Sequence, residues 1–223
     1  MRYYILTLLI FGTLVGCTQE INQNESSDQK QSENPVTNPS EKKSSPSRKE
    51  ASDYVPNPQV TDDRQLVQVG NTVSDEKGEA ELKAYKKLED RVKVGPVELT
   101  IKEVKVIHYR PSYSMVDFFH SYTHDETFDF VKVFLEVENT SGQALNFAPI
   151  AQIVTDLGEQ RTWEEEIYLE ELNGQFAPGE KKAGNLGFII EKPDIRTFSI
   201  TTSKVFDHNK KELNKEKVIK VEF

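Results

Sequence analysis

The stretch Phe130–Glu138, with the sequence FVKVFLEVE, alternates apolar and polar side chains along most of its length. A β-strand directs successive side chains to opposite faces, so this period of two predicts a strand with one buried and one solvated face. The apolar face consists of Val131, Val133, Leu135 and Val137, and the polar face of Lys132, Glu136 and Glu138. A turn is expected directly afterwards, at 139–142, where Asn, Thr, Ser and Gly follow one another.

Segments with the same period lie on both sides of this strand. Residues 92–107 alternate as well, but their apolar positions change phase at Lys102 and Glu103. One extra residue in a strand has this effect, so we predict a β-bulge there. Shorter alternating stretches occur at 145–155, 160–163, 186–190, 198–202 and 219–223. About seven short strands separated by turn residues predict an all-β fold, an antiparallel β-sandwich over residues 92–223.

A different period precedes the predicted strands. Ala80, Ala84 and Leu88 recur at every fourth position, which is the spacing that places side chains on one face of a helix. We therefore predict a short helix between residues 75 and 90. It would belong to a linker, residues 54–91, that joins the sandwich to the N-terminal part of the chain.

Residues 18–53 contain almost no apolar side chains and consist mainly of Ser, Asn, Gln, Glu, Lys and Pro. Such a segment cannot bury enough apolar surface to offset the entropy lost on ordering, so we expect a disordered tether. Its seven acidic and five basic residues give it mixed charge. A polybasic segment that would bind anionic lipid is therefore not predicted.

The chain begins with Arg2 and an apolar run, Tyr3–Val15, that is shorter than the roughly 20 residues of a membrane span. These are the features of a secretory signal peptide. The sequence Leu14-Val15-Gly16-Cys17 at its end resembles the lipobox of bacterial lipoprotein precursors. The resemblance implies cleavage of residues 1–16, a diacylglycerol on the Cys17 thiol and often an acyl chain on the freed amine.

A lipidated Cys17 would make residues 17–53 a lipid-anchored tether on the extracytoplasmic face of the cell membrane. The alternative is an ordinary signal peptide followed by a chance cysteine. Cys17 is the single cysteine of the chain, which favours the lipoprotein and leaves no internal disulfide in the mature domain.

The charge of the chain bears on its partners. The formal net charge is −9, and from Val92 onward 22 acidic residues stand against 16 basic ones. Nucleic-acid binding needs a basic footprint, so we expect no nucleic-acid partner. An acidic domain has no electrostatic attraction to anionic lipid either, so contact with the bilayer is expected only through the N-terminal anchor.

Several short motifs carry a family resemblance. Their order is VKVG at 92–95, VFLEVENT at 133–140, TDLG at 155–158 and APGEK at 177–181, followed by Gly184 and Phe188. This order resembles a secreted domain of unknown function common in lipoproteins of Gram-positive bacteria, which is similar to the immunoprotective extracellular antigen. The resemblance covers residues 90–223. It implies an immunoglobulin-like sandwich and no established enzymatic role.

The segment His108–Phe130 departs from the family pattern as a long aromatic insertion. It holds seven of the 21 aromatic residues and three of the four histidines. Such a long loop is usually functional or disordered, and this one is too aromatic for disorder. Its rings either close the sandwich core as a lid or remain partly exposed as a partner-binding patch. The patch residues would be Tyr113, Phe118, Phe119 and Tyr122.

The two consecutive phenylalanines, Phe118 and Phe119, constrain this segment further. Neighbouring residues of a strand face opposite sides, so both rings cannot point inward. We therefore expect one of the pair to be buried and the other to lie at the surface.

His120 and His124 are four residues apart, with Asp125 beside them. On one helical turn the imidazoles would share a face, and Asp125 could complete a site for Zn²⁺ or Cu²⁺. The residues between them lack the glutamate of a His-Glu-x-x-His motif, so no zinc peptidase is predicted. The acidic run at 164–171 lacks the spacing of a calcium loop, and we interpret it as a solvated face.

These observations together predict a non-enzymatic binding module that is anchored in the bilayer by lipid and contacts an unknown protein or envelope component. The alternative is a metal-handling lipoprotein that uses His120 and His124. An envelope hydrolase would need a nucleophile paired with a general base, and no such pair or motif stands out in the sequence. No cofactor is expected beyond the lipid on Cys17.

Overall fold

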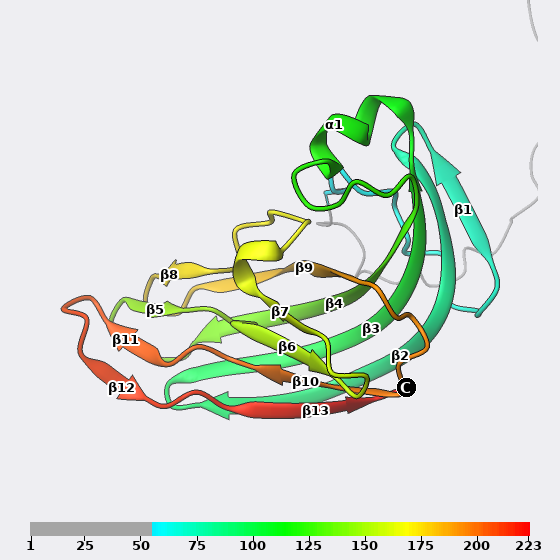
Figure 1. The fold of residues 1–223 in the computed structure, drawn as a ribbon. Coiled ribbons are helices and arrows are strands. Elements are labelled where there is room, and N and C mark those ends of the chain that lie inside the picture. The colour runs from blue at the N-terminus through cyan, green and yellow to red at the C-terminus, as the bar shows by residue number, and fades with distance from the viewer. Residues whose placement is uncertain (1–54) are drawn as a thin grey trace, which may run out of the picture. The chain divides into compact units, whose positions relative to one another are not determined.

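Four long antiparallel strands dominate the computed structural model, which describes residues 55–223 (Figure 1). They are β2 (Gly78–Val94), β3 (Val97–Pro111), β4 (Phe128–Asn139) and β9 (Lys181–Ile190). A short strand, β1 (Thr72–Asp75), extends the sheet beside β2, which gives the order β1-β2-β3-β4-β9. The predicted signal peptide, Cys17 and tether lie outside the described residues.

Two smaller sheets of four strands each pack on one face of the long sheet (Figure 1). The order β13-β10-β6-β7 joins β6 (Gln152–Thr155), β7 (Gln160–Thr162), β10 (Thr197–Thr201) and β13 (Val218–Glu222). The order β12-β11-β5-β8 joins β5 (Leu145–Phe147), β8 (Gly174–Phe176), β11 (Val205–Asp207) and β12 (Glu212–Asn214). The predicted all-β antiparallel sandwich is confirmed, and its immunoglobulin-like assignment stays a prediction.

The number of strands is larger than predicted. The described residues form thirteen strands, where about seven were expected. The predicted strand at 145–155 is divided into β5 and β6, which belong to different sheets. β8, β11 and β12 have three residues each, too few to show a period of two.

The main core lies between the long sheet and the two small sheets, and the aliphatic face predicted for β4 is fully buried in it. In the β3–β4 ladder, Ile101 lies opposite Leu135, but the next pair joins Glu103 to Phe134. Lys102 is therefore the extra residue, which confirms the predicted bulge. The bulge keeps both apolar runs of β3 on the core side.

The helix predicted between residues 75 and 90 is wrong, because this segment forms β2. The β2–β3 ladder is interrupted at Lys83 and again at Leu88 and Glu89. Each interruption shifts the alternation of side chains, and the apolar residues on either side then imitate a helical period. Residues 78–94 pair with β3 along their length, so this part of the predicted linker belongs to the sheet.

A second core lies on the other face of the long sheet. Phe130 and Val131 are neighbours in β4, yet both are fully buried, each in a different core. The second core consists of Val60, Leu66, Ala80, Leu82, Ile107, Tyr109, Phe119, Phe128, Phe130, Ile167 and Tyr168. Lys132, predicted on a solvated face, is 2% exposed because the N-terminal residues 57–66 cover this face of the sheet.

Candidate functional site

Helical structure in the described residues is limited to three short turns. η1 (Tyr113–Met115) and α1 (Val116–Phe119) follow the end of β3, and η2 (Trp163–Glu165) follows β7. No helix within residues 55–223 has the length and apolar character needed to cross a membrane. η1 and α1 both lie in the aromatic insertion predicted to carry a binding site.

Buried aromatic rings form a layer beneath this insertion. The Tyr109 ring lies at its centre, and its centroid is 5.5 Å from that of Phe119, 5.6 Å from Phe128 and 6.1 Å from Phe130. The Tyr109 hydroxyl donates a hydrogen bond to the Lys77 carbonyl oxygen at 3.0 Å, so the polar end of the buried ring is satisfied. The inner rings of the insertion thus fill the second core, on the other face of the long sheet, and not the sandwich core that the predicted lid would have closed.

The two consecutive phenylalanines of α1 have different environments. Phe119 is 2% exposed, whereas Phe118 is half-buried, so one of the pair points inward as predicted. The reason differs from the expected one, because both residues lie in a helical turn and not in a strand. Phe119 packs against Tyr109 and Phe128 in the core, which corrects its prediction as a partner-binding residue.

The other predicted contact residues differ in their exposure. Tyr113 in η1 is 97% exposed. Tyr122 is half-buried, and its ring centroid lies 5.6 Å from that of Phe118. A partner could therefore contact Tyr113 freely, and Phe118 and Tyr122 only in part.

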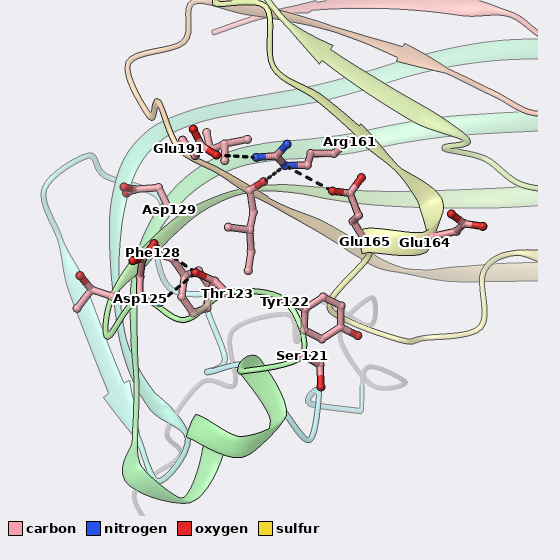
Figure 2. Close-up of a pocket in the computed structure, with 13 residues that line it drawn as sticks. Ser121, Tyr122, Thr123, Asp125, Phe128, Asp129, Arg161, Glu164, Glu165 and Glu191 are labelled. Atoms are coloured by element: carbon pink, nitrogen blue, oxygen red, sulfur yellow. Dashed lines mark hydrogen bonds and ion pairs between the residues drawn. The ribbon is translucent and has the colours of Figure 1, made fainter.

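A groove of about 520 Å³ separates the loop 121–129 from residues 161–165 (Figure 2). We call it the acidic groove. Five carboxylate side chains line it: Asp125, Asp129, Glu164, Glu165 and Glu191. Among the described residues of this lining, Arg161 is the one lysine or arginine.

Arg161 is held by the walls of the acidic groove (Figure 2). Its Nε donates a hydrogen bond to the Ile189 carbonyl oxygen at 2.7 Å. Its Nη2 lies 3.3 Å from a Glu159 carboxylate oxygen and 3.8 Å from one of Glu191. The Arg161 side chain is therefore held by contacts within the protein. The five carboxylates outnumber this one cation, so the groove is negatively charged.

A second groove, of about 820 Å³, includes Tyr113, His120, His124 and Asp125 in its lining. The two imidazole centroids are 5.7 Å apart. Asp125 interacts instead with Thr123, whose hydroxyl lies 3.3 Å from the Asp125 carboxylate. Within the part of the chain that the structure describes, no three His, Cys, Asp or Glu side chains gather where they could hold a metal ion. The predicted three-ligand set is thus not assembled.

A buried cluster of four charges lies where the N-terminal residues cross the long sheet. Asp63 is 1% exposed, and its carboxylate accepts hydrogen bonds from the Lys105 ammonium at 2.8 Å and the Lys132 ammonium at 2.6 Å. A Glu103 carboxylate oxygen lies 3.1 Å from the Lys105 Nζ. Burial alone would raise the pKa of Asp63, but the two lysine charges outweigh burial and hold this pKa below its ordinary value of 3.8. The cluster fastens residues 57–66 to the sheet.

This cluster was not predicted from the sequence, because Asp63 fell in the predicted linker and Lys132 on a predicted solvated face. One signal was available. Lys105 and Lys132 each share a strand face with a large apolar neighbour two positions away, Ile107 and Phe130 respectively. Lysines set among large apolar residues on neighbouring strands indicate that the face is covered.

The acidic run after η2 closes the outer edge of β9. The Gly187 N–H donates a hydrogen bond to the Glu166 carboxylate at 3.0 Å, and the Asn185 N–H donates to Glu170 at 2.7 Å. Glu166 is 6% exposed and also accepts from the backbone N–H groups of residues 168 and 169. Burial raises the pKa of Glu166. Glu166 and Glu170, which were predicted to lie on a solvated face, therefore bind the backbone of β9 and stabilise the fold.

Comparison with known proteins identifies the family. A model described as a domain of unknown function (DUF4352) matches residues 86–211, and the chain belongs to this family. The uncharacterized protein YdhF of Bacillus subtilis (strain 168) is 46% identical over 237 residues, which cover 98% of this chain and 99% of the relative. The prediction that the chain belongs to a family of unknown function is confirmed. Its similarity to the immunoprotective extracellular antigen stays a prediction. The match begins inside β2, so Asp63 lies outside it.

Solved structures show weaker similarity. A functionally unknown protein from Listeria monocytogenes EGD-e has a TM-score of 0.45 and 12% identity, covering 66% of this chain and 88% of its own. The yjhA protein from Bacillus subtilis has a TM-score of 0.41 and 13% identity, covering 60% of this chain and 97% of its own.

Proposed function

We propose that this protein is a lipid-anchored, non-enzymatic binding module on the extracytoplasmic face of the cell membrane. The observation that carries the binding role is the position of Tyr113, which is 97% exposed on η1, next to a layer of buried aromatic rings. An exposed tyrosine supplies a large amphipathic contact area at a low cost in conformational entropy. Aromatic anchors of this kind carry much of the binding energy of protein interfaces.

The surroundings of Tyr113 support the same role. The segment 113–127 contributes lining residues to two grooves, of about 820 Å³ and about 520 Å³, so its exposed side chains are accessible from one groove or the other. Strands β3 and β4 hold the two ends of the segment. Binding residues are commonly found on loops that a rigid scaffold positions in this way. We therefore place the contact face on segment 113–127.

The membrane anchor is tested by Cys17→Ser in the full chain, expressed in Bacillus subtilis cells. The wild type is expected to incorporate labelled palmitate and to sediment with membranes, because the Cys17 thiol is the proposed site of lipid attachment. The variant is expected to lose the label and either to leave the membrane or to remain unprocessed. Thr18→Ser is the control and should behave as the wild type. A variant that is processed and still partitions into detergent would refute the anchor.

The contact face is tested by placing a photo-crosslinking amino acid at Tyr113 of the full chain in the same cells. We expect a discrete cross-linked product at this position. The control is the same amino acid at Val218 in β13, which is 59% exposed but distant in sequence from segment 113–127. Equal products, or none, at the two positions would contradict the proposed contact face.

A further inference from the structure

We infer that a groove beside Trp163 binds a lysine- or arginine-rich peptide segment of a partner protein. The groove measures about 350 Å³, and we call it the Trp163 groove. The residues that carry the inference are Trp163, Glu164, Leu169, Glu171, Leu172 and Leu186. The inference rests on the proposed binding role and adds the chemical class of the partner.

The Trp163 groove combines exposed and buried apolar side chains. Trp163 is 51% exposed and Leu169 is 54% exposed, although both are large apolar residues. Leu172 and Leu186 are buried and line the same groove. A ligand with apolar atoms could therefore cover Trp163 and Leu169, while the buried side chains of Leu172 and Leu186 form the base of the groove.

The backbone holds this arrangement in an uncommon conformation. Leu169 has a φ of 56° and Glu171 a φ of 51°, in the left-handed region that residues with side chains rarely adopt. The buried Glu166 carboxylate accepts a hydrogen bond from the Leu169 N–H at 2.9 Å and so stabilises this turn. Conformations of this kind occur preferentially at binding sites. The turn places the Leu169 and Glu171 side chains at the groove.

The charge of the Trp163 groove calls for a cation. Among the ion pairs of residues 55–223, none involves the carboxylate of Glu164 or Glu171, and the described lining of the groove contains no lysine or arginine. The Lys182 ammonium donates a hydrogen bond to the backbone carbonyl oxygen of Glu171 at 3.3 Å and not to its carboxylate. Glu164 also lines the acidic groove, so the two grooves meet at η2. Complementary charge steers partners and rejects those of the wrong sign.

A lysine or arginine side chain fits both properties of the groove. Its aliphatic stem can pack on Leu169 and Leu172 while its cationic end lies over the Trp163 ring or reaches Glu164. A neutral saccharide could also stack on Trp163, but it would leave the carboxylates without a counter-charge. The charge of the groove therefore favours a basic peptide over a saccharide.

Trp163 is the only tryptophan of the chain, so its fluorescence reports on this groove directly. We would titrate the full chain, purified in a mild non-ionic detergent, with a hexalysine peptide. Saturable change of the Trp163 emission is expected. The double variant Glu164→Gln/Glu171→Gln should bind at least about tenfold more weakly, because both carboxylates that pair with the peptide are lost. Both residues are exposed, and thermal unfolding would verify that the variant folds.

The matched control is Glu216→Gln/Glu222→Gln, which removes two exposed charges near or in β13, outside the groove. It should change the affinity by less than about twofold, since distant exposed charges are screened by salt. Equal weakening by the two double variants would show nonspecific attraction to the acidic chain and overturn the inference. An unchanged Trp163 emission on addition of hexalysine would also overturn the inference. So would binding of a neutral N-acetylglucosamine oligomer with an affinity that neither double variant changes.

The outcomes separate this inference from the proposed function. Hexalysine binding at Trp163 without cross-linking at Tyr113 would refute the contact face on segment 113–127. Cross-linking at Tyr113 without a response of Trp163 would refute only the assignment of a cationic partner.

Discussion

The substitution Asp63→Asn is expected to lower the free energy of unfolding by about 3–5 kcal/mol, the cost of breaking a buried ion pair by removing one partner. It would leave the Lys105 and Lys132 ammonium groups buried with Glu103 as their nearest carboxylate. It would also loosen residues 57–66 from the sheet, because Asp63 is their charged contact with it. Urea unfolding at neutral pH measures the difference.

The neighbouring substitution Asp62→Asn is the matched control. Asp62 pairs with Arg64 at 2.6 Å, but both side chains are partly exposed, so the expected cost is at most about 1 kcal/mol. A cost of at most about 1 kcal/mol for Asp63→Asn as well would show that the buried cluster stabilises the fold no more than an exposed ion pair does.

The contribution of the Asp63 carboxylate to the free energy of unfolding is expected to decrease in acid. The folded pKa of Asp63 lies below its ordinary value of 3.8, so the carboxylate stabilises the fold above that value. This stabilisation is lost as the pH falls through the folded pKa, where the native carboxylate takes up a proton. The difference in stability between the wild type and Asp63→Asn should therefore shrink in acid. A difference that stays constant in acid would contradict this account.

Phe119→Ala is expected to lower the free energy of unfolding by about 3–5 kcal/mol, as other deletions of a buried phenylalanine ring do. The ring is 2% exposed and contacts Tyr109 and Phe128, so its removal leaves a cavity in the second core. Thermal or urea unfolding of the variant gives the value.

Phe118→Ala provides the control within the same helical turn. Phe118 is half-buried, so its loss should cost no more than about 2 kcal/mol. The two values together decide between a core lid and a free loop. A cost below about 0.5 kcal/mol for Phe119→Ala would mean that α1 does not pack on the core.

The sequence predicted those elements whose signal is local. The strand at 130–138 could be found because its aliphatic side chains repeat with a period of two and all reach the main core. The bulge at Lys102 was visible as a change of phase within a single stretch. The strands of the β6–β7 hairpin were indicated by the alternating stretches at 145–155 and 160–163, which flank the TDLG sequence at 155–158.

The features that were missed depend on contacts between distant segments. Asp63 is separated from Lys105 by 42 positions and from Lys132 by 69, so nothing near Asp63 indicates its burial. The strand β2 was mistaken for a helix because its two bulges alter the period. In the acidic run, Glu166 is buried and Leu169 is exposed, because the chain there pairs with the edge of β9 and adopts no regular helix.

Beyond its pairing with β1, the strand β2 forms a free edge of the long sheet. Within the described part of the molecule, residues 84–94 of β2 have no strand partner on the outer side. A long, flat, unpaired edge invites another molecule to add a strand, the first step toward fibrils. The side chains along this edge include Lys86, Lys87, Glu89, Asp90, Arg91 and Lys93. Its two bulges interrupt the ladder and its charges oppose close stacking, so we expect this edge to resist the addition of a strand from a second copy.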